Sequence, residues 1–135
     1  MDYFEIEGKN KLFGDIDISG AKNAVLPLMA AAILNDRALT ITNVPKLSDS
    51  ITMGNLIKGM GGEVNFDDSS IVIDPKKLNT PYAPYKLVKT MRASFYVLGP
   101  LVARFGEAKV SLPGGCAWGP RPVDFHLEGL KKLGI

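Results

Sequence analysis

The sequence predicts a domain of the α/β class. The spacing of apolar residues changes repeatedly between the alternation typical of strands and the three-to-four-residue spacing typical of helices. The order helix, strand, helix also occurs twice along the chain. At 135 residues, with 46% hydrophobic and 22% charged residues, the chain has the size and composition of a globular domain with its own core.

The first half of the chain contains strands, helices and a hairpin. In order, the predicted elements are strands at 3–7 and 14–18, a helix at 21–34, a strand at 39–43, a helix at 49–60 and paired strands at 63–66 and 70–73. Ser48 or Asp49 is expected to cap the second helix, and Gly61 and Gly62 are expected to end it. The polar segment 67–69 separates the paired strands and is typical of a hairpin turn.

After a connector rich in proline, the second half repeats this order. The predicted elements are a long helix at 85–104, a strand at 109–112 and a helix that begins at Pro122. Gly99 and Pro100 are expected to kink the long helix. Its apolar stripe, most of which we expect in the core, consists of Leu87, Met91, Phe95, Leu98, Val102 and Phe105. One face of the last helix carries Val123, Leu127 and Leu130.

The two copies differ between strand and second helix. The second copy carries four more residues over 110–133 than the first does over 41–60. An insertion in one copy of a repeat commonly forms a loop, and such loops often carry function. The second copy also stops at Ile135 without the paired strands, so we interpret the chain as part of a longer one. The alternative is that helix, strand and helix recur by chance, as in many α/β proteins.

Charge and composition exclude several classes of protein. Sixteen basic and 14 acidic residues give a net charge of +2, which argues against nucleic acid or a membrane surface as a partner. The N-terminus does not resemble a secretory signal, and the longest apolar run, 24–34, is too short to span a membrane. One cysteine and one histidine make a metal site unexpected, and a chain without an internal disulfide fits the cytoplasm. Dinucleotide-binding and P-loop motifs are absent, and no cofactor is expected.

Cys116 is the only cysteine, and it lies in a segment rich in glycine and proline, 112–121. A free cysteine is most often a small buried hydrophobe, and that interpretation stays open. Its glycine and proline neighbours instead favour an exposed thiol on a loop. Arg121 is close enough along the loop to help stabilise a thiolate, so Cys116 is a candidate nucleophile or acid.

Two predicted helix starts carry cations. Lys22 and Asn23 lie where a strand leads into the first helix, a position suited to phosphate or carboxylate. The alternative is a solvated lysine, although a lysine there opposes the helix dipole. Arg121 precedes the helix that Pro122 opens, but Asp124 is itself a sufficient partner for that dipole. Together the cations and the thiol indicate a doubly anionic substrate and covalent or acid chemistry.

Four motifs in order along the chain resemble those of the UDP-N-acetylglucosamine enolpyruvyl transferases. They are Ser-Gly-Ala-Lys-Asn-Ala at 19–24, Lys-Thr-Met-Arg-Ala-Ser at 89–94, Leu-Pro-Gly-Gly-Cys at 112–116 and Arg-Pro-Val-Asp at 121–124. The resemblance covers essentially the whole chain, which would be the N-terminal third of such an enzyme. It implies transfer of the enolpyruvyl group of phosphoenolpyruvate to the 3-hydroxyl of UDP-N-acetylglucosamine, with phosphate release, as the first committed step of peptidoglycan synthesis.

The resemblance also implies a role for each candidate residue. Cys116 would be the proton donor, would bond covalently to phosphoenolpyruvate and would be the target of fosfomycin. Lys22 would hold the anionic groups of phosphoenolpyruvate, with Arg121 assisting and Arg92 nearby. Asn23 would contact the amino sugar. The uridine diphosphate would be held by Arg121, Pro122, Val123, Asp124 and Phe125.

The fold implied by the resemblance is an inside-out α/β barrel of the enolpyruvyl transferase type, built from βαβαββ units. Residues 1–20 would be strands that pack with the second lobe of the full-length chain. Residues 21–135 would form part of the first lobe, with unit one at about 21–80 and most of unit two at about 84–135. Because the second lobe supplies further catalytic groups, we expect this chain alone to be inactive. A shikimate-pathway enolpyruvyl transferase and a non-catalytic module that binds nucleotide sugars are the alternatives.

Overall fold

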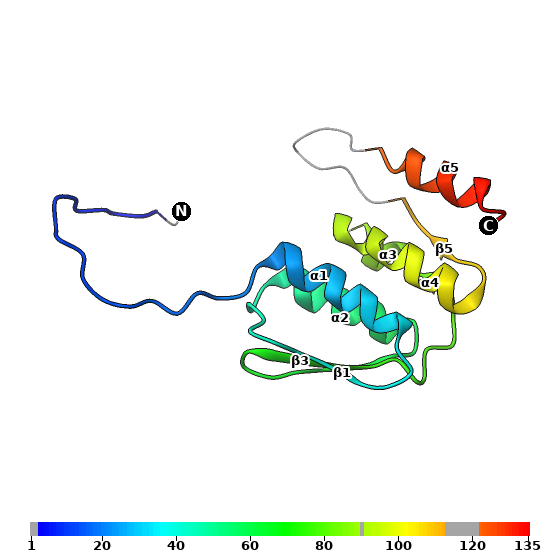
Figure 1. The fold of residues 1–135 in the computed structure, drawn as a ribbon, viewed down its shortest axis with the longest axis horizontal. Helices are drawn as coiled ribbons and strands as arrows, with labels where there is room; N and C mark the ends of the chain where they lie inside the picture. Colours follow the sequence, from blue (N-terminus) through cyan, green and yellow to red (C-terminus); the bar gives the residue numbers. More distant parts are fainter. Residues whose placement is uncertain (1–2, 90, 113–121) are drawn as a thin grey trace.

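The computed structural model describes residues 3–89, 91–112 and 122–135, and Figure 1 shows the arrangement of the elements. In chain order the elements are α1 (Lys22–Ala31), the 3-10 helix η1 (Ala32–Leu34), β1 (Leu39–Thr42), α2 (Ser48–Gly59), β2 (Glu63–Phe66), β3 (Ser70–Asp74), β4 (Tyr82–Ala83), α3 (Tyr85–Val88), the 3-10 helix η2 (Arg92–Val97), α4 (Leu98–Phe105), β5 (Lys109–Val110) and α5 (Asp124–Lys132).

The elements are stacked in layers (Figure 1). Strands β1, β3 and β2 form an antiparallel sheet in that spatial order. Helices α1 and α2 pack side by side over this sheet, and the α3, η2 and α4 segment packs on their other side. Helix α1 therefore has neighbours on both sides, which explains why its sequence is apolar over most of its length.

The core lies between the sheet and the first two helices. In β3 the side chains alternate, and Ile71 and Ile73 are fully buried. They meet a helical layer in which Met29, Met53 and Ile57 are also fully buried. Burying such a side chain stabilises the fold by roughly 1.5–3 kcal/mol. The contact between β3 and the helical layer therefore holds α1 and α2 on the sheet.

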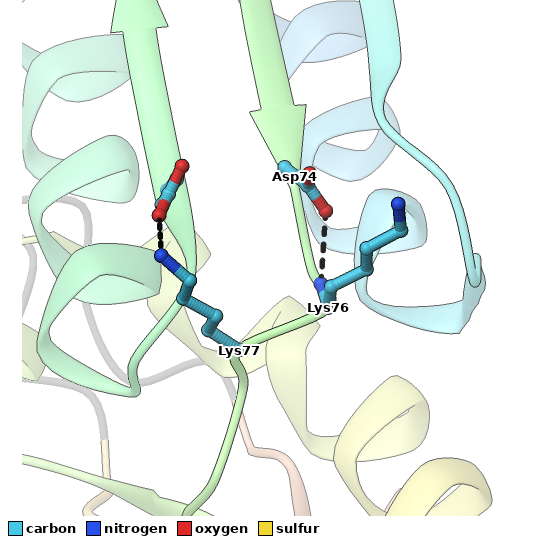
Figure 2. A network of polar contacts seen from close by, with 4 residues as sticks. Asp74, Lys76 and Lys77 are labelled. Atoms are coloured by element: carbon cyan, nitrogen blue, oxygen red, sulfur yellow. Dashed lines mark hydrogen bonds and ion pairs between the residues drawn. The ribbon is translucent and has the colours of Figure 1, made fainter.

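Polar contacts close the turn after β3 (Figure 2). The Asp74 carboxylate accepts a hydrogen bond of 3.0 Å from the Lys76 backbone N–H. The Lys77 ammonium lies 2.5 Å from a Glu63 carboxylate oxygen at the start of β2. Both partners of this ion pair are exposed, so it directs the turn and adds little stability.

Arg104 joins the two halves of the chain. From α4, its guanidinium donates hydrogen bonds of 2.8 Å to the carbonyls of Ile33 and Asn35 and one of 3.2 Å to that of Pro75. The first two carbonyls end the α1 and η1 helical segment, where a cation also complements the helix dipole. One side chain thus ties α4 to the end of the first helix and to the end of β3.

The second half forms a parallel strand pair. Tyr82 and Ala83 of β4 pair with Lys109 and Val110 of β5, and α3, η2 and α4 make the crossover between them. The sequence did not predict β4, because two residues within a proline connector carry no alternation. The strand predicted at 109–112 is shorter than expected, since β4 offers only two residues to pair with.

The strands predicted at 3–7 and 14–18 are wrong. The structure shows these segments as extended chain with exposed side chains, among them Phe4, Phe13 and Ile16. Within the described residues, no strand lies beside them to accept and donate their backbone hydrogen bonds. Alternation therefore identified segments with strand character that have no pairing partner in this chain.

The prediction of one continuous helix at 85–104 is also wrong. It breaks after Val88, where Met91 is extended and the Ser94 hydroxyl donates to the carbonyls of Val88 and Met91. The kink expected at Gly99 and Pro100 does not occur there, because α4 starts at Leu98. Pro100 falls in the first turn of this helix, where its missing N–H costs no hydrogen bond.

The other predicted elements are confirmed with small shifts. The expected cap of α2 is wrong: Leu47 is the N-cap, and neither Ser48 nor Asp49 makes a side-chain capping hydrogen bond. The last helix starts at Asp124, two residues after Pro122. Of the predicted apolar stripe, Met91 and Leu98 are buried, and Leu87 and Phe105 pack against the core.

Replacing Arg104 by Met should destabilise the chain by about 2 kcal/mol, because three carbonyls lose a charged donor while the apolar stem is kept. Urea unfolding monitored by circular dichroism measures the change. Arg37→Met is the matched control, since Arg37 is exposed. Equal stability of the two variants would contradict the role assigned to Arg104.

Candidate functional site

The site is built around the first residues of α1 and α2. Both helices begin at the same end of the helical layer (Figure 1), and an ion pair joins their first turns. The Lys22 ammonium lies 2.8 Å from a carboxylate oxygen of Asp49. The two side chains are 48% and 30% exposed, so the pair is open to solvent on one side.

The two helix starts offer unpaired backbone donors. Neither α1 nor α2 has a side-chain cap, so the first N–H groups of each helix are available to a ligand. Each helix start also carries the positive end of a helix dipole. Pro27 lies inside α1 and cannot donate the i to i−4 hydrogen bond that the Asn23 carbonyl would ordinarily accept. The arrangement is suited to a small anion that also accepts several hydrogen bonds.

The position of Lys22 depends on a close contact two residues earlier. The Gly20 N–H donates a hydrogen bond of 3.0 Å to the Asn43 side-chain oxygen, and the Asn43 amide donates one of 3.4 Å to the Ile18 carbonyl. A Cβ atom at position 20 would lie 1.9 Å from the Asn43 carbonyl oxygen, so only glycine fits. Asn43 itself has φ of 54°, a left-handed conformation that asparagine tolerates.

Asp49 stabilises the charged form of Lys22. The hydrogen bond from Lys22 to Asp49, and the charge of that carboxylate, raise the pKa of Lys22 above its ordinary value. Lys22 is therefore a cation throughout the physiological pH range, suited to bind an anion and unsuited to act as a base.

The predicted residues near the last helix lie on a second surface. Pro122 is exposed, Val123 is the N-cap of α5, and Asp124 is its first residue. Phe125 is 80% exposed and borders a groove of about 490 Å³ between α5 and the η2 and α4 segment. The groove is mainly apolar and is lined by Phe95, Tyr96, Leu98, Gly99, Phe125, His126, Gly129, Leu130 and Leu133.

The side chains of three predicted site residues are not described. Cys116 and Arg121 lie outside the described residues. Arg92 is the first residue of η2, and its side chain is not described. Helix α1, which carries Lys22 and Asn23, packs against η2, the element that begins with Arg92.

Sequence reasoning missed Asp49 as a site residue. It identified Asp49 only as a possible cap of its own helix, whereas the structure pairs it with Lys22. The unfavourable place of a lysine in a helix's first turn indicates that a partner is needed, but 27 positions separate the two residues in the sequence. Only the packing of α1 on α2 makes them neighbours.

The described part of the chain lacks two kinds of feature. Among residues 3–89, 91–112 and 122–135, no three side chains of the metal-binding types cluster together. No helix in those ranges has the length and apolar character needed to cross a membrane.

A solved structure defines the class of protein. The chain superimposes on the enolpyruvyl transferase NikO from Streptomyces tendae with a TM-score of 0.64 and 27% sequence identity, over 73% of this chain and 23% of NikO. The mixed α/β arrangement of the described residues is thus similar to part of an enolpyruvyl transferase.

The sequence comparisons name the family. The model of the EPSP synthase (3-phosphoshikimate 1-carboxyvinyltransferase) family matches residues 6–135, and the chain belongs to this family. A UDP-N-acetylglucosamine 1-carboxyvinyltransferase from Acinetobacter guillouiae is 55% identical over 134 residues, and one from Yersinia pestis (strain Pestoides F) is 51% identical over the same length. Each match covers 99% of this chain and 32% of the relative, so the chain spans about a third of the length of these relatives.

Replacing Gly20 by Ala should separate residues 18–20 from Asn43, because the added methyl group would collide with a backbone oxygen. Loss of the hydrogen bond from residue 20 should speed hydrogen exchange of that amide by roughly tenfold, which corresponds to about 1.4 kcal/mol. Exchange measured by NMR tests this. Gly8→Ala is the control, since no atom lies within 4 Å of the added group. Unchanged exchange at position 20 would contradict the contact.

Proposed function

We propose that this chain is the N-terminal third of an enzyme that transfers the enolpyruvyl group of phosphoenolpyruvate to the 3-hydroxyl of UDP-N-acetylglucosamine. The observation that carries the proposal is the 55% identity, over 99% of this chain, to a relative named UDP-N-acetylglucosamine 1-carboxyvinyltransferase. Such an enzyme makes the first committed precursor of peptidoglycan, and we propose the cytoplasm as its location. Its partners are the two small substrates and the remaining two thirds of the chain.

Lys22 and Asn23 are proposed to bind the substrates at the start of α1. Phosphoenolpyruvate carries a carboxylate and a phosphate, and the reaction redistributes charge between them as phosphate leaves. A fixed ammonium beside free helix N–H groups stabilises such charge without reorganising during the reaction. The exposed side of the Lys22 and Asp49 pair leaves room for these anionic groups, and Asn23 is one residue further along for the amino sugar.

Cys116 is proposed as the proton donor. The sugar hydroxyl gives its proton to a base in the rest of the enzyme and its oxygen adds to the central carbon of phosphoenolpyruvate, while the terminal methylene gains a proton and becomes a methyl group. The tetrahedral adduct then loses phosphate and one proton of that methyl group, which restores the double bond. The Cys116 thiol, which lies near Arg121 in the sequence, can supply the proton and can also bond to the same central carbon.

Residues 121–125 are proposed to hold the uridine diphosphate. Arg121 supplies a cation for the diphosphate, and Arg92 lies at the start of the neighbouring η2. The exposed Phe125 ring and the apolar groove beside it offer a surface for a planar base. Between Arg121 and Phe125 in the sequence lie Pro122, Val123 and Asp124, at the start of α5.

The finer architecture is also proposed. The full enzyme would be an inside-out α/β barrel of two lobes, of which residues 21–135 form part of one. The exposed apolar side chains of residues 3–18 support packing with the second lobe, because so many large apolar groups in one segment favour a covered surface. They are Tyr3, Phe4, Ile6, Leu12, Phe13, Ile16 and Ile18.

A second candidate is transfer of the same group to shikimate 3-phosphate. The name of the matched family model favours it, since that model is described as 3-phosphoshikimate 1-carboxyvinyltransferase. The cysteine segment at 112–116 is the feature that favours the sugar nucleotide instead. Testing both acceptors separately distinguishes the two candidates.

The chain alone should show no phosphate release from phosphoenolpyruvate, because two thirds of the relatives' length is missing. A chimaera that joins residues 1–135 to the remaining part of the Acinetobacter guillouiae relative should release phosphate with UDP-N-acetylglucosamine and not with shikimate 3-phosphate. In this chimaera Lys22→Met should lower kcat/KM for phosphoenolpyruvate by roughly 10²–10³. Lys46→Met is the control, since Lys46 forms a separate exposed ion pair with Asp68. Full activity of the chain alone, or of the Lys22 variant, would overturn the proposal.

Fosfomycin should inactivate the chimaera by alkylation of Cys116, since the thiolate sulfur opens the epoxide and the ring oxygen becomes a hydroxyl. Intact-mass and peptide mass spectrometry locate the adduct, and Cys116→Ser should form none. An active chimaera that resists fosfomycin, or one modified elsewhere, would contradict the role given to Cys116.

A further inference from the structure

Asp49 stands out because it uses its carboxylate on another helix. An aspartate in the first turn of a helix ordinarily stabilises that helix by bonding its own free N–H groups. In α2 no such side-chain bond forms, and the Asp49 oxygen lies 2.8 Å from the Lys22 ammonium of α1. The carboxylate therefore serves the lysine rather than its own helix.

The pair differs from the other ion pairs of the described residues in exposure. Lys46 with Asp68, and Lys77 with Glu63, have side chains that are each more than half exposed. Lys22 and Asp49 are less exposed than either of those pairs, so solvent screens their attraction less. This pair also joins two helices that share one hydrophobic core, whereas the others close turns at the edge of the sheet.

A lysine held by such a partner has lost most of its freedom. The lysine side chain has a flexible four-carbon stem, and an unpaired ammonium at its end would sample many positions. The Lys22 ammonium donates one of its three protons to Asp49, which leaves the other two to donate to a ligand. Helices α1 and α2 contact each other and share one core that includes Met29 and Met53, so the ion pair draws the ammonium toward the start of α2.

We infer that Asp49 is the positioning residue for Lys22: it orients the ammonium toward the anionic groups of the substrate before the substrate binds. The inference rests on the proposed function, in which Lys22 binds phosphoenolpyruvate. Asp49 acts through Lys22 and does not itself contact the reacting atoms. Its contribution is preorganisation, which lowers the barrier because no lysine rearrangement is needed as charge develops.

The kinetic test uses the chimaera defined above. Asp49→Asn should lower kcat about tenfold, equivalent to about 1.4 kcal/mol, while KM for phosphoenolpyruvate stays within about threefold. Loss of orientation weakens anion binding but loss of the competing carboxylate strengthens it, so the two effects on KM offset each other. Asp49→Glu keeps a carboxylate and should recover most of kcat. Asp68→Asn, which removes the partner of Lys46, is the matched control and should leave kcat unchanged.

A second measurement tests the pair in this chain directly. In carbon-13 NMR titrations of the lysine Cε atoms, Asp49→Asn should lower the titration midpoint of Lys22, because Asp49 raises the pKa of that lysine. The midpoint of Lys46 should not move, and Asp68→Asn should show the reverse pattern because Asp68 raises the pKa of Lys46. Asp49 is the one charged group of the described residues that affects the pKa of Lys22.

The outcomes separate this inference from the proposed function. An unmoved Lys22 midpoint, or an unchanged kcat in Asp49→Asn, overturns the positioning role even if Lys22→Met abolishes turnover. A kcat loss that Asp49→Glu does not recover also overturns it, since the defect would then be structural. An inactive wild-type chimaera, or a fully active Lys22→Met chimaera, refutes the proposed function, whatever the Asp49 variants do.

Discussion

Helix α1 is packed on two sides, and the placement of the candidate site depends on this packing. It contacts α2 and β1 on one side and η2 on the other. One face of α1 lies in the core, where Val25, Leu26, Met29 and Ala30 are buried. A helix with one face packed in this way cannot rotate without withdrawing buried side chains and opening cavities, each of which costs stability in proportion to its volume. The start of α1, and with it Lys22, is therefore fixed by contacts made a turn or more away.

The two ends of α1 are completed by side chains from distant parts of the chain. At its C-terminal end, Arg104 reaches across from α4 and binds the carbonyls that end η1. At its N-terminal end, the side chain of Asn43, the residue after β1, hydrogen-bonds residues 18 and 20, and Asp49 of α2 forms an ion pair with Lys22. Structural stability and the geometry of the candidate site are thus linked, because the same helix carries the candidate site at its start and leads into the segment whose carbonyls Arg104 binds.

Much of the fold was predictable because local pattern and tertiary structure agree there. The helices at 21–34 and 49–60 and the hairpin at 63–73 have strong periodicity, and Gly61 adopts the positive φ expected of a helix end. The predictions were wrong where pairing or a side-chain bond decided the outcome. Within the described residues, the segments at 3–7 and 14–18 have strand character without a partner strand. The Ser94 hydroxyl bonds the Val88 and Met91 carbonyls where a helix of continuous apolar spacing is interrupted.

The sequence by itself determined the α/β class, the motif around Lys22 and Asn23, and the family resemblance, because these depend on local order along the chain. Only the tertiary structure decided that Asp49 is the partner of Lys22 and that Asn43 supports Gly20. These contacts join residues more than 20 positions apart. The physical reason is that an ion pair or a close backbone approach depends on distance in space, which the packing of α1 against α2 and β1 sets and which no local pattern records.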